Sequence, residues 1–156
     1  MTNNDVLRRI RYLLDLNDPK VIALFKLANF DVKREQVSNW LKKDDDPLFR
    51  EIGDKELAIF LNGLILEKRG KRDGPTPPPE DPLSNNMIFR KLKIALNLKT
   101  EDIIDLFALI DKQISKNELS AFFRNPDHKS YRHCMDQYLR NFLNGLQTQY
   151  KGKSGE

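Results

Sequence analysis

The side chains best suited to chemistry gather in one segment of the second half of the chain. This segment, PDHKSYRHCMDQYLR at residues 126–140, holds both histidines, the only cysteine and Asp136. Imidazole nitrogen, thiolate sulfur and carboxylate oxygen are ligand types that zinc takes in proteins. The same groups could also serve a mechanism in which a histidine activates a cysteine or moves a proton. We therefore treat this segment first as a candidate site.

The spacing of these residues argues against a metal centre and against a cysteine nucleophile. On a helix His128 and His133 would be poorly aligned, and the neighbours His133 and Cys134 would diverge by about 100°. A single cysteine also excludes an internal disulfide and a thiolate-only zinc site. We predict no metal and no catalytic residue, while Asp136 and His128 are the one sensible acid–base pair if the protein is an enzyme.

The absence of known motifs and the overall composition exclude several classes of protein. The sequence has no GxxxxGK[ST], GxGxxG, HExxH or GxSxG motif, so we predict no cofactor. Lys and Arg number 27 against 23 Asp and Glu, and the net charge of +4 is too small to make the whole molecule a polyanion binder. The N-terminus lacks a signal-peptide core, and no apolar run approaches about 18 residues. We expect a cytoplasmic protein that does not enter a membrane.

A tandem duplication organises the chain. The pentapeptide FLNGL occurs at residues 60–64 and again at 142–146, and a shift of 82 aligns residues 3–71 with 85–153 without a gap. The aligned pairs include 21 identities in 69, where unrelated sequences would share about four or five. We therefore divide the chain into repeat 1 (residues 1–70), a proline-rich linker (71–84), repeat 2 (85–153) and a tail (154–156).

Each repeat has the apolar spacing of α-helices. Hydrophobic residues recur at steps of three and four, and no useful stretch alternates as a strand would. The predicted class is all-α, with about four helices in each repeat. The expected N-caps are Asn4 and Asn86 for the first helices, Asp18 and Thr100 for the second, Ser115 with Glu118 for the third, and Asp54 and Asp136 for the fourth, which should end near Gly70 and Gly152.

The glycine of FLNGL falls inside the fourth helix of each repeat. Glycine in a helix interior costs up to about 1 kcal/mol relative to alanine, so its presence in both copies calls for an offsetting use. We expect Gly63 and Gly145 to mark points where another helix crosses closely. Common inheritance without such a use is the alternative.

Two interpretations of the polar segment are open. The repeats share Asp45/Asp127, Phe49/Tyr131, Arg50/Arg132 and Asp54/Asp136, which suggests a structural clasp in which the arginine bridges a carboxylate beneath an aromatic ring. Repeat 2 alone adds His128, Lys129, His133, Cys134 and Gln137, which suggests that the clasp became a binding pocket. The candidate ligand or partner site is Asp127, His128, Lys129, Tyr131, Arg132, Cys134, Asp136 and Gln137.

Basic residues on the first helices form a second candidate site. Arg8, Arg9 and Arg11 correspond to Arg90, Lys91 and Lys93, and the two sets could present cationic stripes to phosphates. The simpler interpretation is a pair of solvated faces. These six residues are the candidate nucleic-acid-binding residues.

The paired asparagines at Asn3 and Asn85, FLNGLILEKRG and PDHKSYRHCMDQYLRNFLNGL resemble the YehS-like bacterial family, a duplicated domain of unknown function. The resemblance covers essentially the whole chain. It implies a small cytoplasmic bacterial protein of two similar helical domains, and it brings no activity, cofactor or catalytic residue.

We therefore expect a non-enzymatic binding or adaptor protein with a polar site in repeat 2. The alternative is a nucleic-acid-binding regulator that uses the first helices. The sequence does not identify the partner, the ligand or the oligomeric state.

Overall fold

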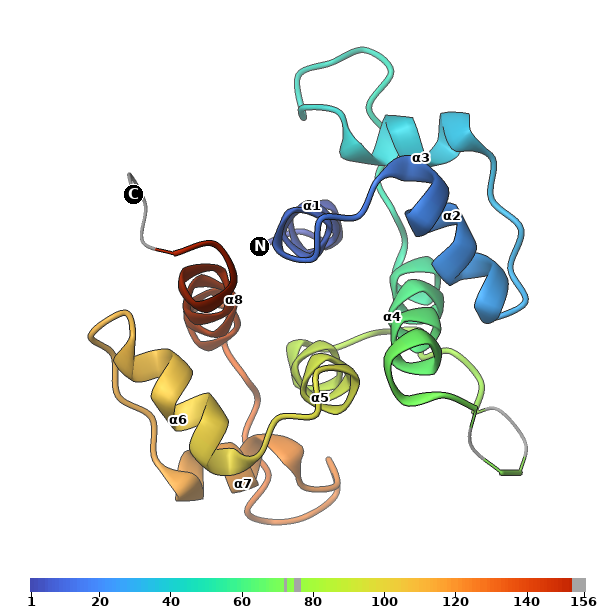
Figure 1. The fold of residues 1–156 in the computed structure, drawn as a ribbon. Coiled ribbons are helices and arrows are strands. Elements are labelled where there is room, and N and C mark those ends of the chain that lie inside the picture. The colour runs from blue at the N-terminus through green and yellow to red at the C-terminus, as the bar shows by residue number, and fades with distance from the viewer. Residues whose placement is uncertain (72, 75–76, 153–156) are drawn as a thin grey trace. The chain divides into compact units, whose positions relative to one another are not determined.

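The structure is a computed structural model that describes residues 1–71, 73–74 and 77–152. The rest of the linker, Lys153 and the predicted tail lie outside the described residues. Within these ranges the chain forms eight helices and no strand, in two compact units, Met1–Leu83 and Ser84–Glu156 (Figure 1). Repeat 1 holds α1 (Asn3–Leu13), α2 (Asp18–Leu27), α3 (Arg34–Leu41) and α4 (Asp54–Arg69). Repeat 2 holds α5 (Asn85–Ala95), α6 (Thr100–Ala108), α7 (Lys116–Phe123) and α8 (Asp136–Lys151), so the all-α tandem repeat is confirmed.

Most helices begin one or two residues earlier than predicted. The hydroxyls of Thr2 and Ser84 cap α1 and α5 by accepting the backbone N–H of Asp5 and Met87, at 3.1 and 3.2 Å. The expected caps Asn4 and Asn86 instead lie in the first turn, where burial gives their amides other partners. In four other helices the N-cap is the residue before the predicted one. It is Asn17 rather than Asp18 in α2, Gly53 rather than Asp54 in α4, Lys99 rather than Thr100 in α6, and Met135 rather than Asp136 in α8.

Other helix ends agree with the sequence. Ser115 and Glu118 form the predicted capping box at α7, in which each backbone N–H donates to the other residue's side chain at 3.0 Å. The fourth helices end at Gly70 and Gly152, which have φ values of 79° and 80°. This left-handed backbone favours glycine because other residues carry a Cβ.

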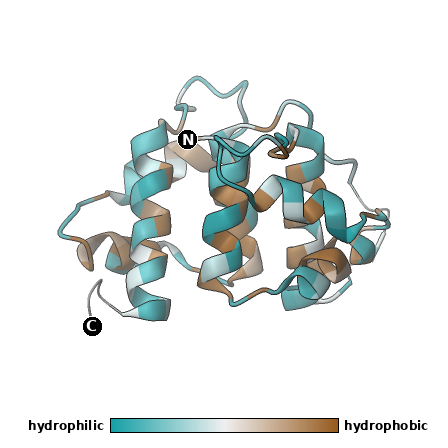
Figure 2. Cartoon of the chain, turned by 90° about the horizontal axis from the view of Figure 1, so that it is seen from above, coloured by the Kyte–Doolittle hydropathy of each residue, from teal (hydrophilic) through white to brown (hydrophobic). Residues whose placement is uncertain are grey.

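Each repeat buries a core of aliphatic and phenylalanine side chains. In repeat 1 the ring of Phe25 lies 5.5 Å from the rings of both Trp40 and Phe60, which joins α2, α3 and α4. In repeat 2 the rings of Phe89 and Phe142 stack at 4.2 Å and join α5 to α8. Single helices carry both hydrophilic and hydrophobic residues, as helices with one buried face should (Figure 2).

The FLNGL glycines lie where the fourth helix of each repeat crosses the second. A Cβ on Gly145 would lie 2.5 Å from the carbonyl oxygen of Leu106 in α6. At Gly63 a Cβ would overlap the carbonyl oxygen of Leu24 in α2 even more closely. The predicted close crossing is therefore confirmed in both repeats, and it is the backbone of the neighbouring helix that requires glycine.

The described end of the linker is attached to repeat 1. The Leu83 side chain is buried, and its backbone N–H donates to the Asp54 carboxylate at 3.0 Å. Asp54 thus holds the chain that leaves repeat 1 as well as the start of α4.

Candidate functional site

The predicted polar segment of repeat 2 forms most of the α7–α8 loop, residues 124–135, whose counterpart is the α3–α4 loop, residues 42–53. Both loops have the same backbone hydrogen bonds. The N–H of Arg50 donates to the Asn39 carbonyl and that of Arg132 to the Ala121 carbonyl, each at 3.1 Å. One framework therefore serves both loops.

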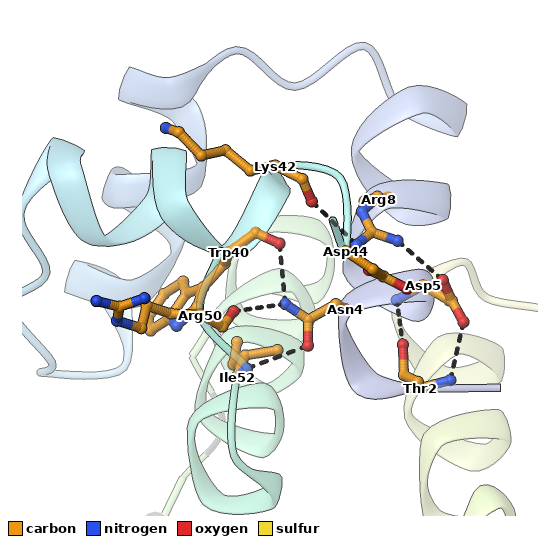
Figure 3. A network of polar contacts seen from close by, with 9 residues as sticks. All are labelled: Thr2, Asn4, Asp5, Arg8, Trp40, Lys42, Asp44, Arg50 and Ile52. Atoms are coloured by element: carbon orange, nitrogen blue, oxygen red, sulfur yellow. Dashed lines mark hydrogen bonds and ion pairs between the residues drawn. The ribbon is translucent and has the colours of Figure 1, made fainter. Parts of the chain in front are cut away.

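A buried asparagine fixes the α3–α4 loop (Figure 3). The Asn4 amide nitrogen donates to the carbonyls of Trp40 and Arg50, both at 2.9 Å, and its Oδ1 accepts the backbone N–H of Ile52 at 3.2 Å. Since Asn4 is only 2% exposed, these three backbone groups have little access to water without it. The side chain thus ties α1 to the end of α3 and to the start of α4.

Repeat 2 has the same arrangement. The Asn86 amide donates to the carbonyls of Phe122 and Arg132 at 3.0 and 2.8 Å and accepts the N–H of Cys134 at 2.9 Å. We call Asn4 and Asn86 the asparagine clamps. Sequence analysis missed them, although an identical Asn pair at both helix starts was the available signal.

The preceding asparagines hold the fourth helices. Asn3 donates to the Ile52 carbonyl at 3.1 Å and to the Asp54 carboxylate at 2.7 Å. Asn85 makes the corresponding bonds to the Cys134 carbonyl at 2.9 Å and to the Asp136 carboxylate at 2.7 Å. The predicted site residue Asp136 therefore helps to anchor α8.

Cys134 lies in the core of repeat 2, where Ile52 lies in repeat 1. Its side chain is 0% exposed, and burial, with a smaller contribution from Asp136, raises the pKa of the thiol to about 12. A thiol with this pKa is almost entirely protonated at neutral pH, and thiolate is the form that attacks and that binds metal. Cys134 is therefore separated from the exposed surface of the loop.

His128 closes a local turn. Its Nδ1 accepts the backbone N–H of Ser130 at 2.9 Å, while in repeat 1 the Asp46 carboxylate accepts the N–H of Leu48 at 2.8 Å. The imidazole thus replaces a carboxylate in the same turn and keeps Nε2 for solvent or a partner. This bond gives His128 a structural role beside any functional one.

The remaining predicted site residues are more accessible. Lys129, Arg132 and His133 are exposed, and their side chains make no hydrogen bond or ion pair with any residue that the structure describes. Asp127 is exposed and Tyr131 half-buried, in the position of Phe49. Gln137 is exposed but bonds within α8, to Asn141 at 2.9 Å and Arg140 at 3.1 Å. The loop thus presents Asp127, His128, Lys129, Tyr131, Arg132 and His133.

The predicted clasp of Arg50 and Arg132 is wrong, because neither guanidinium forms an ion pair with a carboxylate of the described residues. A different arginine of repeat 1, Arg8, makes a contact of this kind with other acids. The Arg50 guanidinium donates to the Phe49 and Pro47 carbonyls of its own loop, at 2.8 and 3.4 Å. Arg8 instead bridges the carboxylates of Asp5 and Asp44, at 2.8 and 2.7 Å. The Arg8 guanidinium carbon lies 5.9 Å from the centroid of the Phe49 ring.

One acid of the Arg8 clasp, Asp5, has a lowered pKa. Burial tends to raise the pKa of Asp5, but hydrogen bonds from the backbone and hydroxyl of Thr2 and the charge of Arg8 outweigh it and lower the pKa below its usual value. The charge of Arg8 is thus compensated within repeat 1.

Among the residues that the structure describes, none forms such a clasp on the corresponding face of repeat 2. Arg90 donates to the Phe123 carbonyl at 2.9 Å, and Lys93 lies 5.5 Å from the centroid of the Phe123 ring. The positions of Asp5 and Asp44 are occupied by Met87 and Pro126. The other predicted nucleic-acid-binding residues, Arg9, Arg11 and Lys91, are half-buried along α1 and α5.

No three or more His, Cys, Asp or Glu side chains among the described residues come together as potential metal ligands. No helix among the same residues has the length and apolar character needed to span a membrane.

Comparison with known proteins gives a family but no activity. The uncharacterised protein YehS of Escherichia coli (strain K12) is 42% identical over 156 residues, which cover 99% of this chain and 100% of YehS. No solved structure matches the chain. The profile of the family described as "Protein of unknown function (DUF1456)" matches twice, over residues 3–70 and 85–152. This chain therefore belongs to the DUF1456 family, and each of its repeats matches the family once.

Proposed function

We propose that the protein is a non-enzymatic binding or adaptor protein of the bacterial cytoplasm, and that the α7–α8 loop recognises its partner. The partner is another protein or a small ligand. The observation that carries this proposal is the contrast between conserved framework and changed surface: both loops have the same clamp and backbone bonds, yet most of their exposed side chains differ. The bacterial relative and the single, buried cysteine support the assignment of the compartment.

The changes in the α7–α8 loop alter its charge. Residues 42–53 contain three basic and four acidic residues, whereas residues 124–135 contain three basic and one acidic residue, with two histidines in addition. The formal net charge therefore changes from −1 to +2 on the same backbone. Folding does not require this change, because the repeat 1 loop has the same hydrogen bonds without it. Recognition of a partner supplies a reason for it.

A loop exchange tests the proposal. His128→Asp, Lys129→Pro, Ser130→Leu and His133→Glu give repeat 2 the side chains of repeat 1 on a backbone that already accommodates them. The reciprocal exchange in repeat 1, D46H, P47K, L48S and E51H, is the matched control. Affinity capture from native lysate, with protein and small molecules identified, should lose its specific partner with the first variant and keep it with the second. Retention of every partner by the first variant would refute the loop's role.

Nucleic-acid binding is the second candidate, and the charge asymmetry between repeats favours it. Residues 3–70 contain 13 basic and 12 acidic residues, and residues 85–152 contain 11 basic and 7 acidic residues. Repeat 2 thus has a net charge of +4 and repeat 1 of +1. Within α5 there are three basic residues and no acidic one. Salt-titrated binding to mixed DNA and RNA tests this function, since affinity for phosphates falls steeply with salt.

A further inference from the structure

Three cations gather where α5 meets the C-terminal end of α7. Arg90 bonds to the Phe123 carbonyl, Lys93 lies over the Phe123 ring, and Arg124 follows in sequence. We infer that these residues, the α7 cation cluster, bind the phosphate backbone of a nucleic acid. The inference rests on the second candidate function and assigns it a specific site that includes Arg124 and omits the first helix of repeat 1.

The same place in repeat 1 is already occupied by carboxylates. Arg8, Arg11 and Lys42 correspond to the three cations of the cluster, and Arg8 contacts Asp5 and Asp44 in addition to the Lys42 carbonyl at 3.1 Å. The two acids leave this group with a formal charge of +1. An anionic ligand would have to displace them from Arg8.

Repeat 2 keeps the cations and lacks the acids. Met87 and Pro126 occupy the acid positions, so the cluster has a formal charge of +3. No carboxylate of the described chain forms an ion pair with Arg90, Lys93 or Arg124. Arg90 and Arg124 are exposed and Lys93 is half-buried. The cluster is therefore accessible, and no ion pair with a described carboxylate compensates its charge.

Stabilisation of α7 alone does not account for the cluster. Cations near the last carbonyls of a helix complement its dipole, and Arg90 does this through one N–H bond to Phe123. In repeat 1 Arg8 donates to the carbonyl of Lys42, one residue beyond the counterpart of Phe123, with both acids present, so a bond from this arginine to the end of the third helix does not require their loss. The Arg90 guanidinium has four further N–H donors, and none of them bonds to a residue that the structure describes. The planar fork of a guanidinium suits phosphate oxygens.

A repeating anion fits the cluster better than a single one. Arg90 and Lys93 are three residues apart on α5, just under one helical turn and about 4.5 Å along the axis, and Arg124 extends the group to the residue that follows α7. Exposed cations hold a lone phosphate weakly, whereas a backbone offers several in a row. Three phosphate contacts predict a slope of log K against log salt of about −2 to −3.

Oligonucleotide binding tests the inference. Fluorescence anisotropy with labelled 20-nucleotide single strands and duplexes, from 20 to 200 mM salt, should detect binding by the full chain. The triple variant R90Q, K93Q, R124Q should bind at least tenfold more weakly and with a smaller salt slope. Met87→Asp with Pro126→Asp, which introduces the acids of repeat 1 without removing any cation, should have a similar effect.

Matched controls make the result specific. K99Q, K112Q and K116Q remove the same charge from exposed positions at the N-cap of α6, in the α6–α7 loop and at the start of α7, and should change affinity less than twofold. Equal weakening by this control, or no association of the wild-type chain at 20 mM salt, would overturn the inference. The same affinity capture from lysate distinguishes the two proposals. If the triple variant still captures the partner that the loop-exchange variant loses, failure of oligonucleotide binding would overturn the α7 cation cluster without affecting the proposal for the α7–α8 loop.

Discussion

The two repeats share the contacts that define the fold and differ in how one face is charged. Each has an asparagine clamp, a second asparagine on the first carboxylate of its fourth helix, and a glycine beneath the second helix. In repeat 1 the α3–α4 loop contains four acidic residues, and Arg8 forms ion pairs with Asp5 and Asp44. In repeat 2 the positions of these two acids hold Met87 and Pro126. The comparison teaches that framework and surface can be tested independently, because one repeat is a control for the other.

The largest expected effect concerns Cys134, which occupies the position of Ile52. With its thiol pKa raised to about 12 by burial, the native protein should react with a disulfide reagent at pH 8 about a thousandfold more slowly than an unfolded cysteine of pKa about 8.5. Because the thiol ionises more readily in the unfolded chain, its contribution to stability should also decrease as pH rises from about 9 toward 12. Rapid modification of the folded protein, measured against a denatured control, would contradict this.

The clamps should give the next largest effect, and equally in both repeats. Asn4→Ala or Asn86→Ala leaves two carbonyls and one N–H without their partner, and we expect a loss of about 3 kcal/mol in the free energy of unfolding. Urea denaturation measures it. The matched substitutions Asn3→Ala and Asn85→Ala, at more exposed positions, should cost less. A large difference between Asn4→Ala and Asn86→Ala would show that the two clamps are not equivalent.

Alanine at the crossing glycines should destabilise both repeats, by slightly different amounts. Helix propensity alone predicts a gain of up to about 1 kcal/mol, but the added Cβ meets a backbone carbonyl that is unable to rotate away. We expect Gly145→Ala to destabilise by about 2 kcal/mol and Gly63→Ala by more, since its helices are closer. Thermal unfolding beside Ser120→Ala, an exposed helical control, distinguishes the two effects. A higher melting temperature for either glycine variant contradicts the close crossing.

The sequence predicted what depends on local pattern and on repetition. Helical spacing, the capping box at Ser115 and the glycine of FLNGL all leave signals within a few residues, so the fold and the crossing could be inferred. Asn4 could not be interpreted in this way, because its partners Trp40 and Arg50 are 36 and 46 residues away and an asparagine near a helix start also suits a cap.

The candidate site was predicted less well for the same reason. The burial of Cys134 could have been inferred from its counterpart Ile52, which is apolar. The reactive and polar side chains around Cys134 suggested a binding pocket instead. The clasp was expected at Arg50, near acids in sequence, whereas Arg8 reaches Asp44 from another helix. Three-dimensional proximity of distant charges has no local signature in one sequence.

The smallest expected effect is the Arg8 clasp, which repeat 2 lacks. Because hydrogen bonds from Thr2 and the charge of Arg8 lower the folded-state pKa of Asp5 against the opposing effect of burial, its contribution to stability is present above the unfolded pKa near 4 and is lost as pH falls below it. Partly exposed ion pairs contribute at most about 1 kcal/mol. Asp5→Asn should therefore reduce the free energy of unfolding by less than about 1 kcal/mol at pH 7 and leave it nearly unchanged at pH 2.5.

The reverse change can be made in repeat 2. Met87→Asp places an acid beside Arg90 and should increase the free energy of unfolding slightly at pH 7 but not at pH 2.5. If both variants changed the free energy of unfolding equally at the two pH values, the acids would act through packing. The ion pairs of Arg8 would then contribute nothing measurable to stability.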